Sequence, residues 1–236
     1  MSQLFHPRTN TFSRLSVFGS IFFVGGVLYL GYVLVRSPYQ TEVGIVRDQP
    51  VPFMHKHHVA ELGIDCRYCH TQVENASNPG MPTTETCMSC HSQVWLNSPL
   101  LEPVRASWRD NKPIQWTKLH DLPDFVYFNH GIHVQKGVRC TTCHGDVSAM
   151  AMMYKDQPMT MQWCLECHRD PLPRTGPLKD VFANGPPPGP RPVTKKADYA
   201  DARLFDRYLS NSGKSAIQKA QDPHFSGMTN CSTCHR

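Results

Sequence analysis

All ten cysteines of this 236-residue chain fall into five pairs of one spacing, and a histidine directly follows each second cysteine. The five motifs are Cys66 and Cys69 with His70, Cys87 and Cys90 with His91, Cys140 and Cys143 with His144, Cys164 and Cys167 with His168, and Cys231 and Cys234 with His235. C-x-x-C-H is the attachment signature of c-type haem. The two thiols form thioethers to the porphyrin, and the histidine is the proximal iron ligand. Zinc sites and disulfide frameworks do not require a histidine after every second cysteine. The sequence therefore predicts five covalently bound haem c groups.

Five porphyrins would fill much of the interior of a chain this short. About 200 residues lie beyond the apolar N-terminal segment, so about 40 residues enclose each haem. Twenty prolines and fifteen glycines favour loops over long regular elements. We therefore expect a mainly α fold with extensive loops, in which one N-terminal transmembrane helix precedes a multihaem cytochrome c domain whose core is largely haem.

The formal net charge of +5 does not indicate nucleic-acid binding. The basic residues are scattered, with no long basic run. Five haems would add about ten propionate charges, which a basic excess compensates. We therefore expect no nucleic-acid partner.

The stretch from Leu15 to Val35 contains no charged residue and is bracketed by Arg14 and Arg36. As a helix it would extend about 31 Å, enough to cross the hydrocarbon core of a membrane. A cleaved signal peptide is the alternative, but the stretch is long for a signal core and no small-x-small cleavage pattern follows it. Haem attachment takes place outside the cytoplasmic membrane of bacteria. We therefore expect a single-pass anchor in the inner membrane, with the haem domain on the periplasmic side.

A second pattern repeats ahead of the haem motifs. Residues 53–58 and 128–133 both read Phe-x-His-x-x-His, and each precedes two C-x-x-C-H motifs. Before the fifth motif, Gln221 takes the place of the first histidine of the pair. Residues three apart on a helical turn share a face and diverge enough to serve two haems. We therefore predict mostly bis-histidine haems, with distal ligands His55, His58, His130, His133 and His224.

Other side chains remain reserve candidates for distal ligation. His120 lies in the connector between the two repeats, and a group of methionines that includes Met150 and Met161 lies between the third and fourth motifs. The methionines either pack against haem edges or supply one axial ligand, which would raise the potential of that haem. His57, between two predicted ligands, is interpreted as a bystander.

The repeat also predicts the order of segments along the chain. Residues 171–193 are rich in proline and glycine and predict an extended loop, and residues 197–221 predict helical ends around a break at Ser212-Gly213. The expected order is a cytoplasmic N-terminus (1–14), the anchor helix (15–36), a linker (37–52), a first two-haem module (53–100), a connector (101–127), a second two-haem module (128–175), a Pro/Gly-rich loop with a helical segment (176–222) and a half-module with the fifth haem (223–236).

Longer stretches around these motifs resemble a known family. They are residues 55–58 (HKHH), 63–70 (GIDCRYCH), 122–130 (LPDFVYFNH), 161–169 (MQWCLECHR) and 231–236 (CSTCHR). These stretches resemble the pentahaem cytochrome subunit of bacterial alternative complex III, and the modules also resemble the class III cytochromes c. The resemblance covers most of residues 50–236 together with the anchor, and the sequence before Cys231 departs from it.

The resemblance implies an electron-transfer subunit that is not an enzyme by itself. The implied partners are an iron–sulfur subunit, polytopic quinol-binding membrane subunits and a monohaem cytochrome c of the same complex. Electrons would pass from the quinol-oxidising iron–sulfur complex to that cytochrome or to a terminal oxidase. Two alternatives remain open: a free-standing multihaem quinol dehydrogenase anchor that feeds a periplasmic reductase, and a multihaem reductase with an open iron position.

Overall fold

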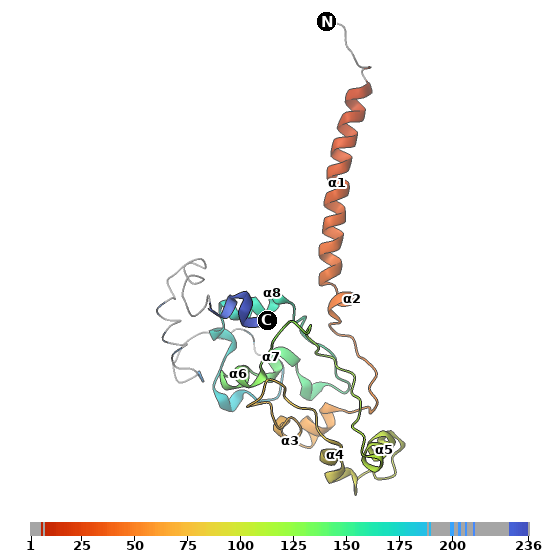
Figure 1. The fold of residues 1–236 in the computed structure, drawn as a ribbon, viewed down its shortest axis with the longest axis vertical. Helices are drawn as coiled ribbons and strands as arrows, with labels where there is room; N and C mark the ends of the chain where they lie inside the picture. The colour runs from red at the N-terminus through yellow and green to blue at the C-terminus, as the bar shows by residue number, and fades with distance from the viewer. Residues whose placement is uncertain are drawn as a thin grey trace. The chain divides into compact units, whose positions relative to one another are not determined.

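The computed structural model describes residue 6, residues 8–187, residue 189, residues 199 and 200, residues 203, 206 and 210, and residues 227–235. The chain divides into two compact units, Met1–Val43 and Gly44–Arg236. Where the structure describes the chain, its regular elements are helices, supplemented by isolated antiparallel bridges such as Val138 with Thr175. The fold is therefore mainly helical, as predicted, with short helices joined by long loops in the second unit (Figure 1).

The first unit contains the long helix α1, Arg8–Arg36, and the short helix α2, Pro38–Thr41. Helix α1 begins at Arg8, before the apolar stretch that starts at Leu15, so its first turns are polar. Near its end, the guanidinium of Arg36 lies 3.8 Å from the centre of the Tyr32 ring. The helix is long enough and apolar enough to cross a membrane. N-terminal signal sequences have a similar length and apolar composition.

Each C-x-x-C-H motif lies on a short helix in the second unit. These helices are α3 (Cys66–Cys69), α4 (Thr84–His91), α7 (Cys140–His144), α8 (Met161–Arg169) and α12 (Cys231–Cys234). A helical turn places residues i and i+3 on one side, so the two thiols of a motif face the same way. Side-chain caps start two of these helices: Asp65 accepts from the Arg67 amide and Thr160 from the Trp163 amide.

The two predicted distal histidine pairs also lie on helical turns. His55 immediately precedes the π-helix η1, Lys56–Glu61, and His130 begins α6, His130–Gln135. The other helices with described bounds are η2 (Pro99–Leu101), α5 (Glu102–Asp110), η3 (Val147–Ala149), η4 (Leu172–Arg174) and η5 (Leu178–Asp180).

The prediction of an extended loop over residues 171–193 is wrong for the first part of that range. Helices η4 and η5 form 3-10 turns there, and Leu172 and Val181 are among the most deeply buried side chains of the described residues. Val181 packs with Val73 and Val134, which come from the two predicted modules. These long-range apolar contacts stabilise a turn conformation that proline content alone does not predict. The helical segment expected over residues 197–221 lies almost entirely outside the described residues.

Apolar side chains form small clusters among the described residues. One contains Val51, Leu101 and Val104 and packs against Cys87 and Met88 of the second motif. Another contains Val73, Val134 and Val181 and packs against Cys140 of the third motif. Each cluster therefore packs against the helix of one haem motif. Porphyrins would supply the apolar surface between the motifs.

Helix α6 docks on the loop that follows the first haem motif. The amide of Gly131 donates to the Ala76 carbonyl over 3.0 Å, and the amide of His130 donates to the Ser77 carbonyl over 3.2 Å. A Cβ atom on Gly131 would lie 3.0 Å from the Glu74 carbonyl oxygen. The close approach of two backbones therefore depends on a glycine at this position.

Replacing Gly131 with alanine is expected to destabilise the protein by about 1–3 kcal/mol, because the contacted atoms are backbone and must shift. The matched control is Gly227→Ala, where a Cβ atom meets nothing within 4 Å. Thermal unfolding of both haem-loaded variants measures the difference. Equal unfolding temperatures for Gly131→Ala and Gly227→Ala would contradict this account of α6 docking.

Candidate haem centres

The two Phe-x-His-x-x-His segments have the same local geometry. The Phe53 ring meets His55 edge-on, with centroids 4.8 Å apart, and stacks on His58 at 4.3 Å. In the second segment, Phe128 meets His130 edge-on at 4.7 Å and stacks on His133 at 4.4 Å. The phenylalanine therefore sets the orientations of both imidazoles. The sequence signal for this role is the phenylalanine two residues before the first histidine of each pair.

Most of the predicted ligand histidines hydrogen-bond through Nδ1 to a backbone carbonyl. A carbonyl oxygen only accepts, so Nδ1 carries the proton and Nε2 keeps the lone pair that can bind a metal. Metal-ligating histidines are commonly oriented in this way. The distances lie between 2.7 and 3.2 Å, and the pairs are His58 with Met54, His70 with Gly80, His91 with Val94, His130 with Ser77, His133 with Asn129, His168 with Met228 and His235 with Phe125.

Three distal–proximal histidine pairs have the spacing of imidazoles that share one metal ion. A metal–nitrogen bond is about 2 Å long, so ring centres on opposite sides of a metal lie about 6 Å apart. The ring centres are 6.2 Å apart for His58 and His91, 6.1 Å for His133 and His168, and 6.4 Å for His130 and His144. In both modules, the second histidine of the pair thus faces the histidine of the second haem motif.

Burial keeps several of these histidines neutral. It lowers the pKa of His55 to about 4 and that of His144 to about 3, with further lowering from neighbouring histidines. The pKa of His130 and that of His133 are also lowered, mainly by burial. A neutral imidazole is the form that binds a metal. The Nδ1 atom of His55 is buried without a hydrogen-bond partner.

The reserve candidates occupy different environments. The Nε2 atom of His120 is buried without a hydrogen-bond partner, and burial lowers the pKa of His120 to about 4. Its ring lies 4.4 Å from that of His144, too close for the two to bind one metal from opposite sides. Met150 is buried and Met161 is exposed. His224 lies outside the described residues.

His57 differs from its neighbours in the first segment. Its Nδ1 atom lies 2.7 Å from a carboxylate oxygen of Glu61, and both side chains are exposed. Its ring stacks on Trp95 with centroids 6.0 Å apart. These contacts give His57 partners on the surface and support its interpretation as a bystander.

All ten cysteine thiols are free of disulfides. The thiols of Cys66 and Cys140 lie next to each other, and their interaction lowers the pKa of Cys66 while raising that of Cys140. The first and third motifs therefore lie side by side. Burial raises the pKa of the Cys143 thiol to about 12, and Thr141 of the same helix is buried, unlike any residue of the other four motif helices. The third motif is therefore the most interior of the five.

The fifth motif docks on the segment just before His130. The Tyr127 amide donates to the Cys234 carbonyl over 2.8 Å, and Val126 forms an antiparallel bridge with His235. The Phe125 carbonyl accepts from His235 at 3.2 Å. On its other side, Met228 accepts from His168 of the fourth motif. The fifth motif is thus attached to the end of the connector, and Met228 just before it is attached to the fourth motif.

These residues fit c-type haem. Five helical turns each present two free thiols followed by a histidine, and buried neutral imidazoles with unused nitrogen atoms lie opposite some of them. The donor set of paired thiols and imidazoles is that of haem c attachment and axial ligation.

Two comparisons with known proteins agree with this chemistry. The family model described as cytochrome c7 and related cytochrome c matches residues 126–181, which include the third and fourth motifs. The multihaem cytochrome c subunit of menaquinone reductase from Nitratidesulfovibrio vulgaris (strain Hildenborough) is 31% identical over 143 residues. That alignment covers 52% of this chain and 68% of the relative.

Proposed function

Because the chain belongs to the family of multihaem cytochrome c subunits, we propose that it is a membrane-anchored pentahaem relay within a quinol-oxidising complex. Electrons would enter from an iron–sulfur subunit and leave to a monohaem cytochrome c or a terminal oxidase, as in alternative complex III. The relative's description as a menaquinone reductase subunit supports a quinone-linked role. The chain by itself would be an electron-transfer subunit.

The observation that carries the proposal is the set of imidazole pairs with ring centres 6.1–6.4 Å apart. We infer that His58 and His91 serve the second haem, His130 and His144 the third, and His133 and His168 the fourth. The repeat assigns His55 and His70 to the first haem. For the fifth haem we infer His235 with His224, and His120, Met150 and Met161 remain reserve ligands. An iron with two protein ligands has no open position for a substrate.

When bound, haem c supplies one-electron exchange between ferric and ferrous iron. The chain holds the proximal and distal imidazoles in fixed orientations through their Nδ1–H bonds to backbone carbonyls. Phe53 and Phe128 pack against the distal rings of His58 and His133, and burial lowers the pKa of His133. Fixed axial ligands of this kind favour electron transfer over ligand exchange.

The domain order, membrane placement and partners form part of the same proposal. Helix α1 would anchor the chain in the inner membrane, with residues 1–14 inside and the haem domain in the periplasm. Haem attachment outside the cytoplasmic membrane supports that orientation. Two two-haem modules (53–100 and 128–175) and a half-module (223–236) would form the wire. Polytopic membrane subunits would oxidise quinol, with no nucleic acid involved.

Menaquinol oxidation by the isolated, full-length, anchored chain and by the complex purified with its partners tests the proposal. We expect menaquinol to reduce the haems rapidly in the complex and poorly in the isolated chain. Robust turnover by the isolated chain would instead indicate a free-standing quinol dehydrogenase. Binding of carbon monoxide or nitrite to the native haems would indicate a reductase with an open iron position.

A further inference from the structure

The loop of residues 92–98 carries the hydrogen-bond acceptor of the second proximal histidine. His91 Nδ1 donates to the Val94 carbonyl over 3.1 Å, and the Val94 amide donates to the Cys90 carbonyl over 2.9 Å. The next residue, Trp95, has a φ of 56°. A bulky residue adopts this left-handed conformation only where its surroundings hold it. The acceptor of His91 therefore adjoins a strained residue, which requires support from outside the loop.

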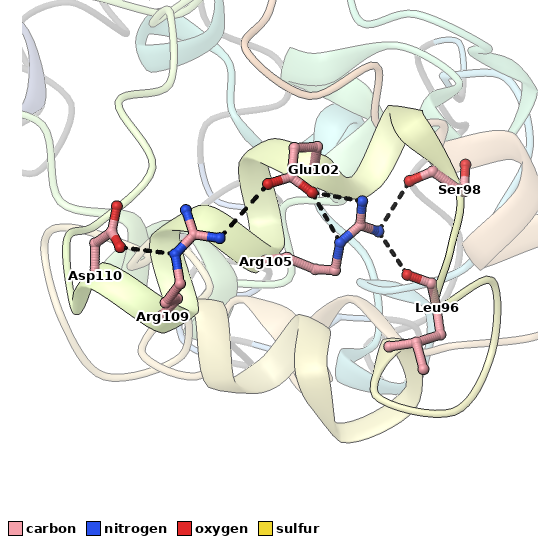
Figure 2. A network of polar contacts seen from close by, with 6 residues as sticks. All are labelled: Leu96, Ser98, Glu102, Arg105, Arg109 and Asp110. Atoms are coloured by element: carbon pink, nitrogen blue, oxygen red, sulfur yellow. Dashed lines mark hydrogen bonds and ion pairs between the residues drawn. The ribbon is translucent and has the colours of Figure 1, made fainter.

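Two side chains outside the loop provide that support: the His57 ring stacks on Trp95, and the residues after Trp95 are bound by Arg105 of helix α5. Its Nη1 atom donates to the Leu96 carbonyl over 2.6 Å and to the Ser98 carbonyl over 2.9 Å (Figure 2). Its Nε and Nη2 atoms donate to one carboxylate oxygen of Glu102 over 3.0 and 2.6 Å. The Arg105 side chain is only 25% exposed. A planar guanidinium with five N–H groups makes these four hydrogen bonds at once, whereas an ammonium group has three N–H groups to donate.

Helix α5 is a firm base for this contact, because it packs on the helix of the second motif. Ser107 Oγ lies 2.6 Å from Thr84 Oγ1 at the start of α4, and Val104 is buried against Cys87 and Met88. Helix α5 therefore contacts the second motif on both sides. Its apolar face packs on helix α4, and its Arg105 guanidinium holds the loop that follows α4.

Arg109, on the same helix, offers a natural comparison. Figure 2 shows it reaching Glu102, at 3.7 Å, and Asp110, at 3.0 Å. Its side chain is 65% exposed. The two arginines share Glu102 as a partner, but the bonds drawn to the loop carbonyls come from Arg105.

We propose that Arg105 is a positioning residue that fixes the His91–Val94 hydrogen bond and thereby lowers the reduction potential of the second haem. The inference rests on the proposed function, in which His91 is a proximal iron ligand. An imidazole that donates Nδ1–H to a well-placed carbonyl is a more electron-rich ligand and favours ferric iron. Loosening the loop would weaken this bond and favour ferrous iron.

Redox titration of the full-length holoprotein, followed by electron paramagnetic resonance, tests the proposal with Arg105→Gln, Arg105→Lys and the control Arg109→Gln. For Arg105→Gln we expect an increase of about threefold in the ferrous-to-ferric ratio of one haem at a fixed potential, equivalent to weakening one hydrogen bond. Arg105→Lys should give a smaller shift, and Arg109→Gln none. The affected signal should be the one that His58→Met also alters.

Unchanged haem potentials in both Arg105→Gln and Arg105→Lys would overturn the proposal. A lower unfolding temperature with unchanged potentials would show that Arg105 has a purely structural role. An equal shift in Arg109→Gln, or a shift in another haem, would also overturn it. If Arg105→Gln does not accumulate, Arg105→Lys decides the outcome. The low-spin signals of the unmodified protein test the proposed function separately, so the two failures are distinguishable.

Discussion

Replacing Cys140 and Cys143 with alanine is expected to lower the accumulation of the folded cytochrome several-fold, whereas replacing Cys231 and Cys234 should leave a stable four-haem protein. Both double variants remove one attachment site, so the number of lost thioethers is the same. The difference comes from position, because the third motif is interior and the fifth begins at an exposed cysteine.

The third motif connects several parts of the fold. The Cys140 amide donates to the Val181 carbonyl over 3.1 Å, and Cys140 packs against Val73, Val134 and Val181. Its thiol lies next to that of Cys66 in the first motif. Loss of the third haem would therefore remove apolar contacts from both modules.

Within the part of the chain that the structure describes, the fifth motif is held by hydrogen bonds to residues 125–127 and by the contact between His168 and Met228. Haem content per polypeptide, measured from the absorption of the pyridine complex, and the yield of membrane-extracted protein test the contrast. The yield of the Cys140 and Cys143 variant should fall several-fold below that of the Cys231 and Cys234 variant. Equal accumulation of the two would contradict the central place of the third motif.

Local sequence patterns predicted the parts of the candidate site that depend on spacing. The C-x-x-C-H motifs lie on helical turns, and the histidine pairs at residues 55–58 and 130–133 adopt matching conformations. These features follow from side-chain periodicity over one or two turns, which the sequence contains directly. The cytochrome c7 family match over residues 126–181 independently supports the multihaem domain.

Features that depend on distant contacts were not predictable in this way. The turns at Leu172–Arg174 and Leu178–Asp180 accompany the buried side chains of Leu172 and Val181, and Val181 packs against Val73 and Val134. The carbonyl partners of the histidines depend on loop conformation: Ser77 accepts from His130, 53 positions away, and Met228 accepts from His168, 60 positions away. Backbone acceptors have no residue-type signature, so no sequence pattern identifies them.

Replacing His58 with alanine is expected to convert one haem from low-spin to high-spin and to open it to carbon monoxide. The inferred pairing makes His58 the distal ligand of the second haem, with His91 on the other side at a ring distance of 6.2 Å. Without a distal imidazole, the iron would keep one strong axial ligand and gain an open position. His58→Met should restore a low-spin haem with a higher potential, because a thioether stabilises ferrous iron.

His57→Ala is the matched control, because His57 is adjacent in sequence and lies on the same helical turn. Its imidazole faces Glu61 and Trp95 at the surface, so its removal should leave every haem low-spin. His58 also stacks on Phe53, so thermal unfolding of both variants separates lost packing from lost ligation. Electron paramagnetic resonance and carbon monoxide difference spectra provide the measurement. Low-spin haems throughout His58→Ala, or a high-spin signal in His57→Ala, would show that the distal assignment is wrong.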